Sequence, residues 1–412
     1  MAPPSKSEAH RALIAASMAD NPTIIHNLPG ELSDDLAATM KVMHRIFATE
    51  FYHSGDIVTV VPNRNASRRC VVADCNESGT TLRLTFPLVG ALLPKDGCVT
   101  FVGHGRLPQR PMAPQVDAMV ENGITCNATY LPLTISGRLK PGVYSLPGNI
   151  SSQYISGLLF ALPLLEGDSV IKLTTPLESG DYIGITTEVL HKFGINVEEI
   201  EGGWRVPGNQ HYHSPGEFQV LGDWSNSALW MAVGAVNPKP ITLRGLDHNS
   251  HQGDRKIVDF LRQYGAEVTV TGDSVTVCNP TMKPLNGIEI NIRNTPDLMP
   301  VLAMLSTACG EPTRFTNAYR LRYKETDRLA TSADLISDLG GTYAQTLDGL
   351  IVDPGSLIGG VARSQNDHRL VMAAIVGAHI CMQQVTIEGA EACRKSYPSL
   401  WDDYAALGGK VQ

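Results

Sequence analysis

Basic side chains stand in the first turns of several apolar, helix-like segments of the sequence: Lys6, Arg11, Arg83 and Arg369. The N-terminus of a helix already carries partial positive charge, so its first turn favours Asp or Glu, and a cation there reduces stability. The free N–H groups at a helix start also bind anions. We therefore expect these helix starts and cations to converge on an anionic ligand.

Small polar residues precede every one of the apolar segments, at residues 5–7, 78–80, 151–153, 223–225, 295–297 and 366–368. Ser, Asp and Pro are ordinary residues of helix N-caps and first turns, so capping alone explains most of these positions. Capping does not explain the cations that accompany them.

The apolar segments form an internal repeat of about 71 residues, and six copies fill the chain, starting near Arg11, Arg83, Tyr154, Asn226, Leu298 and Arg369. Amphipathic segments between them end at Gly123, Gly194, Gly265, Gly340 and Gly408, where a left-handed residue terminates a helix without steric cost. The first copy has no Gly at this place. Each copy is long enough for two helices and three or four strands, so the sequence predicts an α/β protein.

The chain of 412 residues is too long for one core. Three copies of the repeat approach the size at which a single core stops growing, so we expect two lobes of three copies, over residues 5–221 and 222–412, with residues 1–4 at the hinge. Strand-like segments precede the apolar helices at residues 70–73, 142–145, 217–220 and 288–291, whereas the first copy has only MAPPSK. Pro3 and Pro4 cannot donate to a sheet, so an unpaired strand edge is expected in the C-terminal lobe.

The composition excludes several classes of protein. A net charge of -8 disfavours a protein that coats nucleic acid. No apolar run reaches the roughly 18 residues of a membrane span, and the first residues do not resemble a signal peptide, so a cytoplasmic protein is expected. The eight Cys form no CxxC pair, which favours reduced and mostly buried thiols, and the close His pairs lack a carboxylate framework, so no metal site is expected.

Ten short motifs in register with the repeat resemble the enolpyruvyl transferases, and among them the 5-enolpyruvylshikimate-3-phosphate synthases: PSKSEAHRAL, ESGTTLR, HGRLPQRP, ISSQY, ESGDYI, LGDWS, TPDLMP, LRYKETDRL, NDHR and RKSYP. The resemblance covers the whole chain in order. It implies a two-lobed inverted α/β barrel of six βαβαββ units, three per lobe, with the active site in the cleft between the lobes.

The resemblance also implies a reaction without a cofactor, in which phosphoenolpyruvate transfers its enolpyruvyl group to the 5-hydroxyl of shikimate 3-phosphate and phosphate is released. Both substrates carry a phosphate and a carboxylate, which gives the cations at the helix starts a function. It implies a soluble enzyme, expected to be a monomer, that binds neither nucleic acid nor membrane and is inhibited by the herbicide glyphosate at the phosphoenolpyruvate site.

The motifs assign site residues one by one. Phosphoenolpyruvate is expected to contact Lys6, Gly79, Arg106, Gln153, Arg328, Arg369 and Lys395. Shikimate 3-phosphate is expected to contact Lys6, Ser7, Arg11, Ser151, Ser152, Gln153, Ser179, Tyr182, Asp297 and Lys324. Asp297 is the expected base for the hydroxyl proton, Glu325 is expected to give and retake the carbon proton, and Lys6 to share either transfer.

Some positions depart from the motifs, and rival interpretations remain. Glu77 stands where many members of the family have Asn, and Arg320 replaces an Asn that lies close to the shikimate phosphate in some of them. The closest rival is a UDP-N-acetylglucosamine enolpyruvyl transferase, which normally carries Lys-Asn where this chain has Lys6-Ser7 and a Cys in the loop that here spans residues 101–108. A scaffold without activity is a third possibility, although the acidic and basic site residues are all present.

Overall fold

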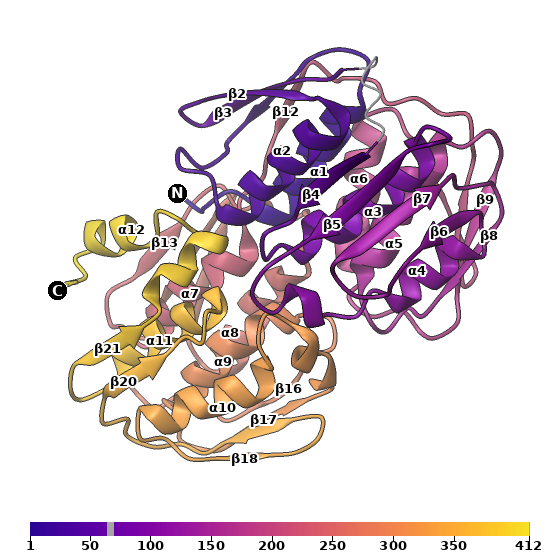
Figure 1. Cartoon of the computed structure of the whole chain (residues 1–412). Helices are drawn as coiled ribbons and strands as arrows, with labels where there is room; N and C mark the ends of the chain where they lie inside the picture. The colour runs from indigo at the N-terminus through magenta and orange to yellow at the C-terminus, as the bar shows by residue number, and fades with distance from the viewer. Residues whose placement is uncertain (64–69, 412) are drawn as a thin grey trace. The chain divides into compact units, whose positions relative to one another are not determined.

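The computed structural model describes residues 1–63 and 70–411, and the chain divides into two compact units. The N-terminal unit is Pro4–Val220, and the C-terminal unit combines Met1–Pro3 with Leu221–Gln412. In Figure 1 the first unit runs from indigo to magenta and the second from pink to yellow.

Within residues 4–63 and 70–220, the N-terminal unit contains three four-stranded sheets and six α-helices. The helices are α1 (Lys6–Met18), α2 (Asp34–Phe47), α3 (Gly79–Leu92), α4 (Ala113–Val120), α5 (Ser152–Ala161) and α6 (Asp181–Lys192). The strands are β1 (Thr23–His26), β2 (Glu50–Ser54), β3 (Ile57–Val61), β4 (Cys70–Asp74), β5 (Cys98–Val102), β6 (Ile124–Cys126), β7 (Leu133–Gly137), β8 (Val143–Leu146), β9 (Ser169–Leu173), β10 (Glu198–Ile200), β11 (Gly203–Val206) and β12 (Glu217–Gln219).

The same pairing recurs in the three sheets of the N-terminal unit. Their strand orders are β12-β1-β3-β2, β4-β5-β7-β6 and β10-β11-β9-β8. Each sheet has one parallel pair, namely β12 with β1, β4 with β5, and β8 with β9, followed by antiparallel pairs. The strand before the fourth apolar helix, β12, therefore completes the sheet of the first copy.

The C-terminal unit repeats the arrangement with smaller sheets. Its helices are α7 (Trp224–Ala235), α8 (Ile257–Gln263), α9 (Met299–Ser306), α10 (Arg328–Asp338), α11 (His368–Ile380) and α12 (Leu400–Ala406). Its strands are β13 (Ile241–Leu243), β14 (Glu267–Thr271), β15 (Ser274–Cys278), β16 (Glu289–Asn291), β17 (Thr313–Thr316), β18 (Tyr343–Gln345), β19 (Leu350–Val352), β20 (Gly360–Arg363) and β21 (Val385–Glu388). The sheet orders are β13-β15-β14, β16-β17-β19-β18 and β20-β21.

The three-stranded sheet of this unit has β13 at its edge within the described part of the chain. Next to it, the backbone N–H of Ala2 donates to the carbonyl of Arg244 at 2.8 Å, and the N–H of Asp223 donates to the carbonyl of Pro3 at 2.7 Å. Through these bonds residues Met1–Pro3 belong to the C-terminal unit, beside the end of β13.

The six apolar helices predicted from the repeat are α1, α3, α5, α7, α9 and α11. Five of them begin with a side-chain N-cap that accepts a backbone N–H two or three residues further on: Ser5, Ser78, Ser151, Asp223 and Asp367. The exception, α9, follows a 3₁₀ turn over Pro296–Leu298 and has no side-chain cap. The polar segments before the helices therefore act as caps, as capping chemistry predicts.

The glycines after the second helices are left-handed, with φ of +106° at Gly123, +78° at Gly194 and +90° at Gly265. In the first copy, which has no Gly there, Ala48 takes the same role with φ +53°, and its N–H donates to the carbonyl of His44. The first copy keeps the geometry of the repeat at a steric cost that glycine avoids.

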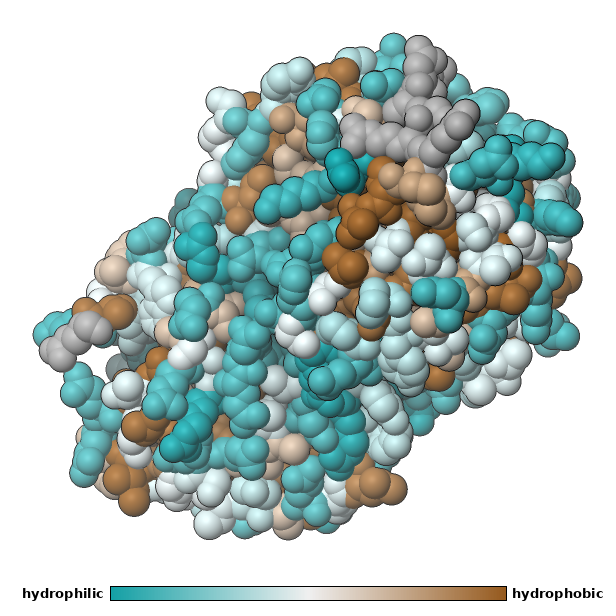
Figure 2. Space-filling view, in the orientation of Figure 1, coloured by the Kyte–Doolittle hydropathy of each residue, from teal (hydrophilic) through white to brown (hydrophobic). Residues whose placement is uncertain are grey.

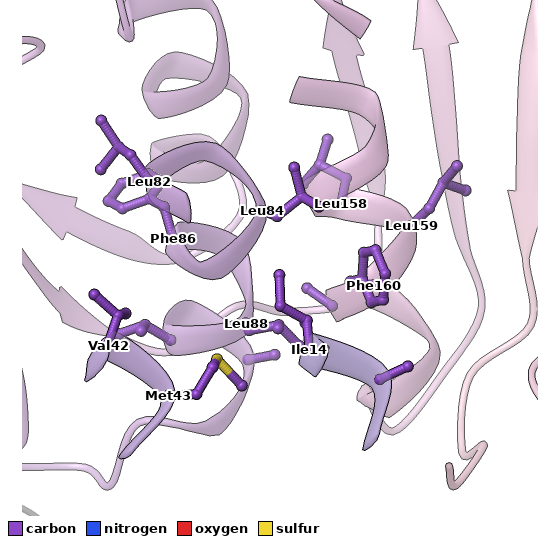
Figure 3. Packing of buried hydrophobic residues seen from close by; sticks show 14 of the residues in the cluster. Ile14, Val42, Met43, Leu82, Leu84, Phe86, Leu88, Leu158, Leu159 and Phe160 are labelled. Atoms are coloured by element: carbon purple, nitrogen blue, oxygen red, sulfur yellow. The ribbon is translucent and has the colours of Figure 1, made fainter. Parts of the chain in front are cut away.

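Each unit has its own apolar core, built around its three apolar helices. In the N-terminal unit the side chains of α1, α3 and α5 meet; Figure 3 shows Ile14, Leu84, Leu88, Leu158 and Phe160 together in this core. The corresponding core of the C-terminal unit contains side chains of α7, α9 and α11. A helix surrounded by apolar neighbours can expose only its ends, and these carry the predicted site residues.

Hydrophilic residues cover most of the face shown in Figure 2, with smaller apolar areas among them. Within residues 1–63 and 70–411, no helix is long and apolar enough to cross a membrane. The expectation that the thiols are mostly buried is wrong, because only Cys75, Cys309 and Cys393 are buried among the eight Cys.

Candidate active site

In the N-terminal unit, hydrogen bonds join the starts of α1, α2, α3 and α5. Lys6 Nζ lies 2.8 Å from Asp35 Oδ2, and the backbone carbonyl of Asp35 accepts from Thr81 at 3.4 Å. Next to Thr81, the hydroxyl of Thr80 accepts from Gln153 Nε2 at 2.9 Å. The structure therefore brings three predicted site positions, Lys6, Gly79 and Gln153, to one end of this helix cluster.

Arg11 is almost fully buried and donates to groups of its own unit. Nε donates to Thr186 at 2.7 Å, Nη1 to the carbonyl of Ser7 at 2.7 Å, and Nη2 to the carbonyl of Tyr182 at 3.2 Å. Burial lowers the pKa of Arg11 to about 10. Arg11 thereby holds α1 against α6 and positions two other predicted ligands, Ser7 and Tyr182.

A buried histidine lies behind the start of α1. His10 Nδ1 is 2.7 Å from the hydroxyl of Thr39, and within the described residues its Nε2 has no hydrogen-bond partner. Burial lowers the pKa of His10 well below its usual value, and the charges of Lys6 and Arg11 lower it further. A neutral His10 adds no further positive charge next to Lys6 and Arg11.

The start of α3 lies against a cation that the motifs did not single out. A Cβ added to Gly79 would stand 2.8 Å from Nη1 of Arg110, a buried side chain. The predicted ligand Arg106 lies four residues earlier, is half-buried, and precedes a 3₁₀ turn over Leu107–Gln109. In the same loop, the Glu77 carboxyl fills the space beside Gly105, where φ is +55°. Arg110 is therefore a site candidate in addition to Arg106.

The remaining predicted residues of this unit surround the starts of α5 and α6. Ser151 caps α5, Ser152 begins it and is buried, and Ser179 precedes α6 with φ +54°. Arg83 Nη1 donates to Gln153 Oε1 at 2.9 Å, which fixes that amide from the side of α3. The predicted ligands of this unit are cations, hydroxyls, an amide and a glycine, with no carboxylate among them, so they are suited to bind phosphate and carboxylate groups.

In the C-terminal unit, one buried arginine holds three carboxylates. Arg328 Nε and Nη2 bind the two oxygens of Asp367 at 2.8 and 3.1 Å, Nη1 binds Asp297 Oδ1 at 2.7 Å, and Nη2 lies 2.8 Å from Glu325 Oε2. Asp367 is fully buried, and these charges raise the pKa of Arg328 well above its usual value against the effect of burial. Both predicted catalytic carboxylates, Asp297 and Glu325, therefore form ion pairs with the same guanidinium, that of Arg328.

Asp297 lies among three cations. Besides Arg328, Lys324 Nζ is 3.3 Å from its Oδ1 and Arg369 Nη2 is 3.9 Å from its Oδ2. Burial lowers the pKa of Lys324, although the charge of Asp297 opposes this shift. The Asp297 carboxyl is thus held between side chains that come from three different segments of this unit.

The other predicted cations of this unit belong to α11 and to a 3₁₀ turn over Ala390–Lys395. Arg369 follows the Asp367 cap and donates to Asn226 Oδ1 of α7 at 3.2 Å. Lys395 is buried, and its Nζ donates to the carbonyl of Asn366 at 2.6 Å. Arg369 thus links the starts of α7, α9 and α11, whereas the contact given for Lys395 is with the loop before α11.

A further buried carboxyl adjoins this cluster and was missed in the motifs. Asp254, in a 3₁₀ turn over Gly253–Lys256, is 2% exposed and accepts from the hydroxyl of Ser225; its Oδ1 has no partner among the described residues. Burial, reinforced by the charge of Asp297, raises the pKa of Asp254 to about 7. Only its burial among like charges distinguishes it, and sequence carries no signal of that.

Within the described ranges, no group of three or more His, Cys, Asp or Glu is placed to hold a metal ion. The predicted site residues of the two units differ in chemistry: those of the first include cations and no carboxylate, and those of the second include Asp297 and Glu325 together with the cations that contact them. The first set can bind anions, and the second can move protons.

Comparison with known proteins agrees with these features. The sequence profile of EPSP synthase (3-phosphoshikimate 1-carboxyvinyltransferase) matches residues 1–404. A 3-phosphoshikimate 1-carboxyvinyltransferase of Clostridium acetobutylicum is 38% identical over 99% of this chain and 94% of its own length. That of Halobacterium salinarum is 37% identical over 99% of this chain and 95% of its own.

Two solved structures share the fold. EPSP synthase from Acinetobacter baumannii superposes with a TM-score of 0.80 at 23% identity, covering 99% of this chain and 95% of that one. The enolpyruvyl transferase NikO from Streptomyces tendae gives 0.78 at 19% identity, covering 100% and 94%. The α/β fold predicted from the repeat is confirmed as the enolpyruvyl transferase fold, and the full-length match shows that the chain belongs to the EPSP synthase family.

Proposed function

We propose that the protein transfers the enolpyruvyl group of phosphoenolpyruvate to the 5-hydroxyl of shikimate 3-phosphate and releases phosphate, a step of aromatic amino acid biosynthesis. The observation that carries this proposal is the pair of partly exposed carboxylates, Asp297 and Glu325, on the single buried guanidinium of Arg328. An addition followed by an elimination needs two groups that handle protons at different atoms, and the pair supplies them.

The first proposed step is addition. Asp297, ionised among its cations, takes the proton of the 5-hydroxyl as the oxygen bonds to C2 of phosphoenolpyruvate. Glu325 delivers a proton to C3, so the methylene carbon becomes a methyl group in a tetrahedral adduct. In the second step Glu325 retakes a proton from C3, the double bond forms again, and phosphate leaves with the electrons of its C–O bond.

The proposed ligands fall into two sets. Lys6, Gly79, Gln153 and the serines at the starts of α5 and α6 belong to the N-terminal unit. Lys324, Arg369 and Lys395 belong to the C-terminal unit with the proton-transfer groups. We add Arg110 to the phosphoenolpyruvate ligands, because its buried guanidinium stands at the start of α3 against Gly79.

Glu325→Gln tests the assignment of the carbon acid. The amide keeps the size of the side chain but cannot exchange a proton with C3, so turnover should fall roughly 10²–10⁴-fold while both substrates still bind. Steady-state release of phosphate and calorimetric binding separate the two effects. Glu311→Gln, an exposed position of the same unit, serves as the matched control. Turnover of Glu325→Gln within about threefold of the control would contradict the assignment.

The choice of acceptor is tested separately. Release of phosphate from phosphoenolpyruvate should require shikimate 3-phosphate and should not occur with UDP-N-acetylglucosamine. The opposite preference would identify the rival transferase, and no release with either acceptor would identify a scaffold.

A further inference from the structure

Two thiols stand side by side at the start of the β4–β5 pair. Cys70 and Cys98 are partners in the parallel register, and Cys98 Sγ donates to Cys70 Sγ across 2.6 Å. Neighbouring strands lie about 4.8 Å apart, which is within the Cα separation that disulfides span. A bond between these sulfur atoms would therefore form without moving the backbone.

Both thiols lie on the more exposed face of the sheet. Exposure alternates along β4, so Cys70, Val72 and Asp74 share the exposed face, and Cys70 lies on an edge strand. Val72 and Asp74 also line a groove of about 510 Å³ beside α2. Cys98 is half-buried. Small oxidants and reductants in solution can thus reach Cys70 first and Cys98 next.

No other pair of sulfur atoms is joined by a hydrogen bond in the described part of the chain. Cys75, Cys309 and Cys393 are buried, and burial raises the pKa of each thiol, which suppresses the reactive thiolate. Donation from Cys98 to Cys70 raises the pKa of Cys98 and leaves Cys70 as the better placed attacking sulfur.

We infer that Cys70 and Cys98 are a site of reversible oxidation by peroxides, independent of the transfer reaction. The Cys70 thiolate attacks one oxygen of hydrogen peroxide and breaks the O–O bond, which gives a sulfenic acid and hydroxide; the hydroxide takes up the proton that the Cys70 thiol lost and becomes the first water. The Cys98 thiol then attacks the sulfenic sulfur, forms the S–S bond and releases the second water. Each sulfur gives up one electron and each peroxide oxygen gains one; a dithiol reductant reverses the change by thiol–disulfide exchange.

The disulfide would connect the beginnings of two strands whose far ends lead to Gly79 and to the Arg106 loop. The pairing of β4 with β5 is already formed in the reduced protein, so the native register persists. The bond chiefly restricts the unfolded chain, because it closes the segment that contains α3. The oxidised protein should therefore melt at a higher temperature than the reduced protein.

The test uses the intact protein, first fully reduced and freed of reductant, then treated with hydrogen peroxide and alkylated. Peptide mapping should show a peptide linked through Cys70 and Cys98, two of the eight thiols protected, and recovery of both after dithiothreitol. The melting temperature should rise by roughly 4 °C or more on oxidation and return on reduction.

Two variants separate this site from general thiol oxidation. Cys98→Ser should leave a sulfenic acid at Cys70 that dimedone traps, with no rise in melting temperature. Cys126→Ser, a half-buried position on β6 of the same sheet, should keep the link. Alkylation of both Cys70 and Cys98 after peroxide treatment, or over-oxidation of Cys70 in wild type without a link, would overturn the inference.

Discussion

Asp254→Asn should change how the stability of the protein depends on pH. Asp254 is buried, its Oδ1 has no partner among the described residues, and its pKa is raised to about 7 from an ordinary value of 3.8. Between these two values the folded protein holds a proton that the unfolded chain has lost. The free energy of unfolding of the wild type therefore falls as the pH rises through this window, and the loss is complete above pH 7.

The size of the effect follows from the shift. One pKa unit corresponds to about 1.4 kcal/mol, so raising the pH from 5.5 to 7 costs the wild type about 2 kcal/mol through this group. The amide of Asn cannot ionise and can still accept from the Ser225 hydroxyl. Relative to the wild type, Asp254→Asn should gain about 2 kcal/mol between pH 5.5 and pH 8.5, which is roughly 4–8 °C in melting temperature for a unit of this size.

The assay is thermal unfolding at pH 5.5, 7.0 and 8.5 for wild type, Asp254→Asn and a control. Asp259→Asn is suitable as the control because Asp259 is exposed on α8 of the same unit. The difference between Asp254→Asn and wild type should widen with pH, whereas the control should follow the wild type. Parallel curves for Asp254→Asn and wild type would refute the reasoning that burial keeps this carboxyl protonated.

Three further substitutions test separate features. Ala48→Gly should raise the free energy of unfolding by about 1 kcal/mol, measured in urea, because Ala48 has a φ of +53° that glycine adopts without steric cost. A lower free energy of unfolding would contradict the inference that the backbone of Ala48 is strained. Gly79→Ala should weaken glyphosate binding more than phosphoenolpyruvate binding, because the new Cβ would press on Arg110; equal losses in competition assays would count against this. Asp367→Ala should cost roughly 3–5 kcal/mol, because it removes the buried partner of Arg328, and a loss under about 1 kcal/mol would exclude that role.

Local chemistry made much of the fold predictable. The left-handed glycines and the polar caps are properties of single helix ends, and their spacing revealed six copies of one unit. The sequence gives no comparable indication of which distant strands pair in a sheet. The strand β12 lies beside β1, about 190 residues earlier in the chain, and nothing in its own sequence indicates that partner.

The same division applies to the candidate site. Lys6, Gln153 and Arg369 could be identified because they stand at helix starts within recognisable motifs. Asp35, Arg110 and Asp254 matter through contacts that only the folded chain creates, such as the bond between Lys6 and Asp35 across 29 positions. Arg11 and Arg328 were expected as ligands, and the structure shows in addition the protein groups that each of them holds.

The most direct test of the proposed chemistry is the reaction of phosphoenolpyruvate with shikimate 3-phosphate in D₂O, followed by mass spectrometry of the product. If Glu325 gives and retakes the carbon proton, the enolpyruvyl ether should carry deuterium on its methylene carbon, and phosphate should appear in equal amount. Glu325→Gln should slow the appearance of both signals together, by the roughly 10²–10⁴-fold expected for its turnover. An ether formed without deuterium, or full activity of the variant, would contradict addition and elimination through this residue.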